Sequence, residues 1–263
     1  MRPLHVIDAA AITSLGHDLF RTIASLRSGL STFRELPFLG SSQRNLQASP
    51  VVGYAEGLEG VARYEALALR ALVPLVTRIP AAERSHVKLV VGLPRPDRLG
   101  VPARLGASLL ERLVRALSLD PRRVYSLEWG RPSVLAALGD AALMDDAVDH
   151  VIVGGVDVLT NPRSLRLLSE AGLLKEQWDG FIPSDAAAFV RVSHRPASAW
   201  GRPPACIAGV GVAEDPALGS AESPRIGVGL TAAFKAATHG AGLTDSSIDL
   251  RINDINGERT WFQ

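Results

Sequence analysis

The sequence predicts a layered α/β fold built around a mostly parallel β-sheet. Two observations support this fold class. Short runs rich in β-branched residues alternate along the chain with longer stretches of helical periodicity. The 263 residues are 47% hydrophobic, which is enough to bury a sizeable core. A formal net charge of +1 argues against a nucleic-acid-binding surface, which normally carries a clear basic excess.

The elements of the first part follow from short apolar runs and from apolar residues repeated every three or four positions. Leu19, Ile23 and Leu26 form one stripe of the first helix, which stops at Gly29. Residues 30–50 are expected to be a loop, because Pro and Gly interrupt them. In chain order, we expect a strand at 4–12, a helix at 17–29, a strand at 51–56, a helix at 61–79 that Pro74 would kink, a strand at 87–94, a helix at 103–119, a strand at 123–129, a helix at 132–144, a strand at 150–159, a helix at 162–171 and a strand at 186–193.

A second, smaller region follows a linker. Residues 194–204 are rich in Pro and polar residues, which is typical of a connection between two units. Beyond it we expect a strand at 206–215, a helix at 225–243 and a strand at 248–257. The chain therefore divides into an N-terminal half, 1–196, and a partial second half, 197–263.

Several classes of site are disfavoured by what the sequence contains. Cys206 is the only cysteine, which excludes an intramolecular disulfide and a multi-cysteine metal site. The six histidines show no metal-binding spacing, and no glycine run has the dinucleotide-binding spacing, so we expect neither a metal nor a cofactor. No signal peptide or run of about 18 apolar residues is present. We therefore expect a cytoplasmic protein with no membrane or nucleic-acid partner.

Four stretches, in this order, resemble the β-ketoacyl synthases of the thiolase superfamily. Residues 6–38 resemble the family's N-terminal strand, turn and helix, and HVIVGGVDVL (150–159) resembles its strand with a double glycine followed by an acidic residue. DGFIPSDAAAFVRVS (179–193) resembles a glycine-rich family stretch, with Asp185 at the acidic position. Residues 194–257 resemble the start of the family's second half. The resemblance implies a thiolase-like layered α-β-α fold, its first half complete and its second half partial.

The residues that the family's acyl-transfer chemistry requires are not at the matching positions. The resemblance places Trp129 where the family has its nucleophilic Cys at a strand-to-helix turn, with Glu128 beside it. The indole of Trp129 cannot act as the nucleophile that takes up the acyl group, and its bulk would plug an acyl tunnel. Asn256 falls where the family has a catalytic His. Asp185 is either a structural acid that ties down the site loop, as its family counterpart does, or a solvated loop residue.

Other residues offer weak substitutes for the nucleophile. We expect Cys206 to be a buried thiol within a strand. Ser133 would need a His base that no sequence feature supplies, so we interpret it as a surface or capping residue in the first turn of a helix. No catalytic residue of the family type is therefore identified.

The leading functional hypothesis is a catalytically silent β-ketoacyl synthase-like protein. It would serve as an accessory or partner-binding subunit, similar to a chain-length factor or to an adaptor encoded beside bacterial secretion cargo. The alternative is an active acyltransferase of the 3-oxoacyl synthase type that uses Glu128 as a base. A third hypothesis is an α/β binding protein of another family. We expect a homo- or hetero-oligomer, because the family dimerises across a strand near 123–129, with an acyl carrier protein or an active synthase as further candidate partners.

Overall fold

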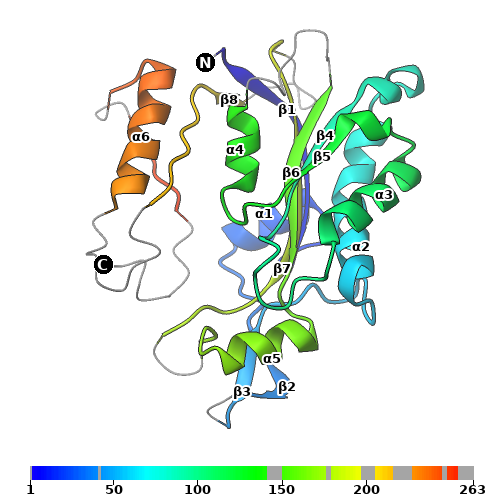
Figure 1. The fold of residues 1–263 in the computed structure, drawn as a ribbon, viewed down its shortest axis with the longest axis vertical. Helices are drawn as coiled ribbons and strands as arrows, with labels where there is room; N and C mark the ends of the chain where they lie inside the picture. The colour runs from blue at the N-terminus through cyan, green and yellow to red at the C-terminus, as the bar shows by residue number, and fades with distance from the viewer. Residues whose placement is uncertain are drawn as a thin grey trace.

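The computed structural model describes residues 2–40, 43–140, 150–175, 179–196, 205–215, 227–244 and 248–253. Its core is one six-stranded sheet with the strand order β5-β4-β6-β7-β1-β8 (Figure 1). The strands are β1 (Leu4–Thr13), β4 (Lys88–Gly92), β5 (Val124–Leu127), β6 (Val151–Val158), β7 (Asp185–Ser193) and β8 (Ala205–Ile207).

The sheet is mixed, so the prediction of a mostly parallel sheet is wrong. β4 pairs parallel with β5 and β6, whereas the pairings β6–β7, β7–β1 and β1–β8 are antiparallel. The alternation of strands and helices does not fix strand direction here, because helix α5 (Pro162–Glu170) lies at the end of the sheet instead of crossing one of its faces (Figure 1). The chain can therefore return along β7 beside the strand that it has just left.

Helices cover the two faces of the sheet. α2 (Gly60–Thr77) and α3 (Leu105–Leu117) pack on one face, and α4 (Ser133–Gly139) packs on the other (Figure 1). Successive side chains of a strand point to opposite faces of the sheet, so the core is divided between the two faces. Leu89 and Val91 join the cluster beneath α2 and α3, whereas Val90 joins the cluster beneath α4. α2 runs past Pro74 to Thr77, and two short 3₁₀ helices, η1 (Ala81–His86) and η2 (Pro121–Arg123), precede β4 and β5.

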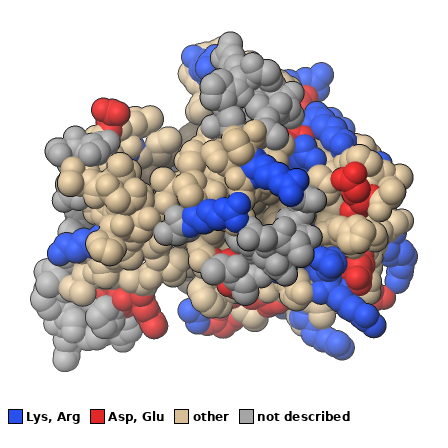
Figure 2. Space-filling view, turned by 90° about the horizontal axis from the view of Figure 1, so that it is seen from above, with Lys and Arg blue, Asp and Glu red and all other residues tan. Residues whose placement is uncertain are grey.

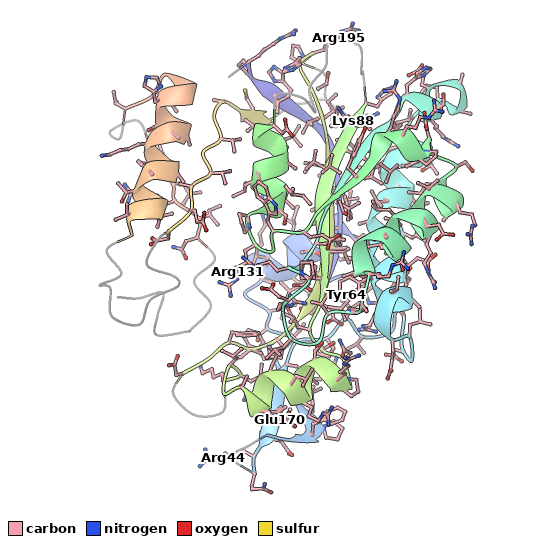
Figure 3. All side chains as sticks on the ribbon, in the orientation of Figure 1. Arg44, Tyr64, Lys88, Arg131, Glu170 and Arg195 are labelled. Carbon is pink, nitrogen blue, oxygen red and sulfur yellow. The ribbon has the colours of Figure 1, made fainter. Side chains whose placement is uncertain are left out.

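A small lobe closes one end of the sheet. Strands β2 (Arg34–Leu39) and β3 (Asn45–Ala48) form an antiparallel hairpin, so the prediction of a loop over 30–50 is wrong. The hairpin is stabilised by tertiary packing that the local sequence does not reveal, because a cluster that includes Leu46 and Leu165 buries it against α5. Arg44 and Glu170 mark this lobe at the opposite end of the molecule from Arg195 (Figure 3).

The second region packs on the α4 side of the sheet. β8 pairs with the start of β1, and the chain then runs between α4 and α6 (Val228–Ala241) (Figure 1). Gly139 of α4 lies against Val210, and a Cβ on Gly211 would fall 2.9 Å from the backbone nitrogen of Ala237 in α6. The surface over α6, at the left of Figure 2, carries few charged side chains.

Several predicted boundaries need correction. Residues 51–56 form bends and turns, because Gly53 and Gly57 adopt positive φ, and no strand is found there. The strand predicted at 206–215 is only the three residues of β8, since β1 leaves room for no longer pairing. Residues 248–253 form no strand, and the rest of that predicted strand lies outside the described residues, as does most of the linker. The helix predicted at 132–144 ends at Gly139, because the backbone of Asp140 is extended, and residues 141–144 lie outside the described residues. The division at residue 196 remains a prediction.

We predict that Gly154→Ala destabilises the fold by about 2–3 kcal/mol, the usual cost of overpacking a core. Gly154 lies in β6 against β7, and an added Cβ would fall 2.5 Å from the Cα of Phe189, so backbone must move. Gly240→Ala is the matched control, because nothing lies within 4 Å of its added methyl group and alanine favours the helix. Urea unfolding measures both variants, and equal midpoints would contradict this account of the β6–β7 contact.

Candidate functional site

The turn between β5 and α4 stands at the carboxyl end of two parallel strands, where open α/β sheets bind ligands. β5 ends at Leu127, and Glu128, Trp129 and Gly130 lead into α4. Gly130 has φ of 77°, a conformation that disfavours side chains, and its N–H donates to the carbonyl of Leu93 at 3.0 Å. Glycine at this position therefore fixes the turn against the end of β4.

Ser133 is the first residue of α4 and is buried. Its Oγ accepts a hydrogen bond from the N–H of Trp129 at 3.0 Å and donates one to the carbonyl of Leu93 at 3.3 Å. The hydroxyl therefore holds the turn both as a hydrogen-bond donor and as an acceptor. Among the described residues no histidine hydrogen-bonds Ser133. This geometry is that of a structural hydroxyl and not of an activated nucleophile.

Trp129 lies at the rim of the turn with 54% of its surface exposed. It lines a pocket of about 360 Å³ with Glu128 and with Arg95, Pro96 and Asp97 of the loop after β4. It also lines a groove of about 700 Å³ that follows β5 and α4 to Val210 and Val212. The indole is therefore a shared wall of two open spaces. That its bulk plugs an acyl tunnel stays a prediction.

Glu128 sits against the N-terminal end of α3. Its Oε1 accepts a hydrogen bond from Ser126 Oγ at 3.2 Å, and the carboxylate occupies the space that a Cβ on Gly106 would need. The partial positive charge of a helix N-terminus favours a carboxylate there. Glu128 is half-buried, so part of it remains open to the pocket.

The other charged groups of the pocket neutralise each other. Both Nε and Nη2 of Arg95 donate to Asp97 at 3.0 Å. This hydrogen bonding holds the pKa of the Asp97 carboxyl below its usual range and raises that of Arg95. Because the pair is on the surface, its effect on stability is small.

The groove beside β5 is mostly apolar. Its walls are formed by side chains of β4, β5, α4 and the 210–212 segment, including Val90, Leu127 and Ala137. Lys88 lies at one end, where its Nζ is 5.8 Å from the centre of the Tyr125 ring. β5 is an edge strand of the described sheet, and Tyr125, Ser126 and Leu127 of this strand line the groove.

The carboxylate of Asp185 accepts hydrogen bonds from several neighbouring residues near the site. It is 1% exposed and begins β7. Arg63 of α2 donates to its Oδ2 through Nε at 3.0 Å and Nη2 at 2.6 Å. The N–H groups of Leu159 and Thr160, just after β6, donate to its Oδ1 at 2.9 and 3.0 Å, and the Thr160 hydroxyl donates to Oδ2 at 2.6 Å. Asp185 therefore joins three elements and is not a solvated loop residue.

A neighbouring polar cluster was not anticipated from the sequence. The Tyr64 hydroxyl donates to Oδ1 of Asp157 at 3.1 Å, and Arg98 donates to both carboxylate oxygens of Asp157. Burial, followed by the charge of Asp157, raises the pKa of Tyr64 well above its ordinary value. Figure 3 shows Tyr64 toward one end of the sheet and Lys88 toward the other.

One signal in the sequence points to the buried arginine. Arg63 occupies the same four-residue spacing as the buried residues Leu67, Ala71 and Leu75 of α2. A charged residue at a core position of a helix requires a buried partner. The sequence gives no local indication that this partner is Asp185, which lies 122 positions away.

Cys206 does not complete a site at the turn. It is exposed on β8, so the prediction of a buried thiol is wrong. The physical reason is that β8 is short and lies at an edge of the described sheet, with no helix covering this residue. β5 is at the opposite edge, five strand spacings away, which is roughly 24 Å across the sheet. Asn256, the position expected for a histidine, lies outside the described residues.

The described part of the chain offers neither a metal-binding cluster nor a membrane-spanning helix. No group of three or more His, Cys, Asp or Glu side chains there is arranged to hold a metal ion. None of the helices described is long and apolar enough to cross a membrane.

Solved structures of ketosynthases have the same fold as this chain. The ketosynthase ApeO in complex with its chain length factor ApeC, from Xenorhabdus doucetiae, matches with a TM-score of 0.74 at 18% identity, over 94% of this chain and 70% of that one. The oxazolomycin ketosynthase domain OzmH KS7 from Streptomyces albus JA3453 matches with a TM-score of 0.73 at 18% identity, over 93% and 53% of the two chains. A β-ketoacyl synthase from Burkholderia phymatum STM815 matches with a TM-score of 0.63 at 16% identity, over 94% and 72%.

These matches confirm the thiolase-like layered fold and the resemblance to ketosynthases in structure. At such low identity they establish the fold alone. The chain spans 70% of the first of these structures and 53% of the second, so the fold is covered only in part. No protein-family model matches the sequence, and no curated protein matches it.

We predict that Asp185→Asn lowers the free energy of unfolding by about 3–5 kcal/mol, the usual cost of breaking a buried ion pair on one side. The amide would leave Arg63 without its counter-charge and would turn an N–H₂ toward groups that donate hydrogen bonds. Asp97→Asn, which removes an exposed partner of Arg95, should leave the urea midpoint unchanged. A midpoint for Asp185→Asn within error of the native protein would disprove the anchoring role.

Proposed function

We propose that this chain is a catalytically silent ketosynthase-like protein that acts as an accessory or partner-binding subunit, similar to a chain-length factor or an adaptor. One observation carries the proposal. The strand-to-helix turn between β5 and α4, where the resemblance places the nucleophile, presents Trp129. Acyl transfer through a covalent intermediate needs a thiolate or an activated hydroxyl at such a position.

The positions of the other two candidate nucleophiles support the proposal that the chain is catalytically silent. Ser133 is buried and uses its hydroxyl to hold the turn. Cys206 lies at the far edge of the sheet from β5, too distant to reach a substrate bound at Trp129. The β5–α4 turn keeps its shape without a catalytic nucleophile, because the hydrogen bonds that shape it come from the backbone and from Ser133.

The edge at β5 supports partner binding. An unpaired strand edge next to an apolar groove favours pairing with another chain. Tyr125 is exposed on β5, and the groove of about 700 Å³ lies along the same edge. We propose a homo- or hetero-oligomer assembled across β5 in the cytoplasm. Among the structural relatives, one ketosynthase is in complex with its chain length factor, and another is in complex with an acyl carrier protein. A synthase or an acyl carrier protein is therefore a candidate partner of this chain.

An active acyltransferase with non-standard residues is the second candidate, because a specific observation favours it. The pocket of about 360 Å³ reaches Glu128, and Trp129 does not close it. A carboxylate at a pocket wall has the geometry of a general base. The pairing of Arg95 with Asp97 leaves Glu128 as the acidic group in that pocket without a cationic partner among the described residues.

We predict that the protein forms no covalent adduct when it is incubated with acyl-coenzyme A and acyl-carrier-protein thioesters, as measured by intact mass. Trp129→Cys should gain an adduct of acyl mass, because the thiol would stand at the strand-to-helix turn with the pocket open beside it. Ser133→Cys is the matched control and should stay unlabelled, since its side chain is buried.

An adduct on the native chain would contradict silence, and peptide mapping would then show which residue carries it. To test the second candidate, thioester turnover is compared between the native chain and Glu128→Gln. Turnover that falls at least 100-fold in the variant would establish a Glu128-dependent activity and overturn the proposal.

We predict that the chain is oligomeric in light scattering at micromolar concentration, and that Tyr125→Glu lowers its mass. The glutamate would place a charge on the exposed side of β5, where a partner strand would pack. Val73→Glu, an equally exposed site on α2, should leave the mass unchanged. A monomeric mass for the native chain would count against self-association and would leave only a different protein as the partner at β5.

A further inference from the structure

Helix α1 (Leu19–Arg27) packs on the sheet with its polar side inward. The Thr22 hydroxyl lies 3.1 Å from that of Thr13 in β1 and donates to the carbonyl of Asp18 at 2.9 Å. Ser25 donates to the carbonyl of Leu15 at 2.9 Å. Gly16 allows this close approach, because a Cβ there would lie 2.6 Å from the backbone nitrogen of Thr22. Thr22 and Ser25 thus hold this side of α1 against β1 and the turn that follows it.

The apolar side of the same helix faces solvent. No residue of α1 is buried, and Phe20 and Leu26 are 70% and 67% exposed. Ile23 and Leu30 are exposed as well, and with Phe20 and Leu26 they form what we call the α1 stripe. A surface helix normally turns its apolar stripe toward the core. A contiguous apolar stripe on a helix that is anchored by its polar side marks a surface that another element covers.

The charge on this stripe restricts what can cover it. Arg27 follows Phe20 by seven positions and Ile23 by four, so it lies within the apolar stripe. Among the described residues the Arg27 side chain makes no hydrogen bond or ion pair, and the acid at the other end of the helix, the N-cap Asp18, pairs with Arg21. Covering Arg27 with apolar groups alone would bury an unpaired charge, which is costly. The covering element must therefore bring a carboxylate.

We propose that the α1 stripe docks an amphipathic helix of a partner protein whose apolar face carries a carboxylate opposite Arg27. A second copy of this chain that packed α1 against α1 would bring only another Arg27 and no free carboxylate. A helix is the natural occupant because its apolar residues recur at the spacing of the stripe. The surface lies outside the turn at Trp129, so the inference holds whether or not that turn is silent.

The test uses the full chain and two fluorescein-labelled helical peptides of 18 residues. Each has a leucine face, and they differ at one position within that face, glutamate in one and lysine in the other. Fluorescence anisotropy should show at least tenfold tighter binding of the glutamate peptide. Leu26→Asp should abolish its binding, and Arg27→Glu should reverse the preference so that the lysine peptide binds more tightly.

Two matched variants control for charge and for exposed apolar area. Leu230→Asp removes a leucine of α6 that is 77% exposed, and Arg166→Glu reverses an exposed charge on α5. Neither should change peptide affinity. Circular dichroism should show native unfolding for all four variants, because each side chain is exposed. Equal affinity of the two peptides, no binding, or equal loss with the control variants would overturn the proposal. Self-association that Leu26→Asp abolishes would overturn it in favour of a second copy.

Discussion

The buried carboxylate of Asp185 holds together the end of the sheet on which the candidate site is built. It receives the guanidinium of Arg63 from α2 and two backbone N–H groups from the chain that leaves β6, while it begins β7 itself. A buried charge of this kind is stable only while every partner is in place. The position of α2 on the sheet, the exit of β6 and the entry of β7 are therefore coupled through one side chain.

That coupling holds the strands beside the β5–α4 turn in a defined arrangement. The β5–α4 turn is shaped by Gly130 and by Ser133, which both bind the carbonyl of Leu93. Asp185 and the Tyr64–Asp157 pair fix the neighbouring strands. None of these interactions depends on a side chain that reacts with substrate. The shape of the β5–α4 turn and the anchoring of the strands beside it are thus carried by different residues.

The sequence predicts the buried strands and the amphipathic helices well, because their periodicity is local. It does not predict the direction of β7, since that depends on α5 closing the end of the sheet instead of crossing its face. The β2–β3 hairpin is missed because Leu46 is buried against Leu165, more than a hundred residues away. Glu128 and Trp129 lie at a strand-to-helix turn, but no local pattern shows that Gly130 binds this turn to the carbonyl of Leu93 after β4. The exposure of Cys206 follows from strand order, which no local pattern encodes.

Three described surfaces of the fold lie outside its hydrophobic core. The β5 edge, the groove beside it and the α1 stripe are apolar or unpaired, and all belong to well-formed elements of the chain. α1 is the clearest case, because its hydrogen bonds to β1 fix its orientation before any partner arrives. A helix that is already ordered loses little conformational entropy on binding, so more of the free energy of covering Phe20 and Leu26 contributes to affinity. The fold thus offers preformed apolar surfaces on separate elements of the chain.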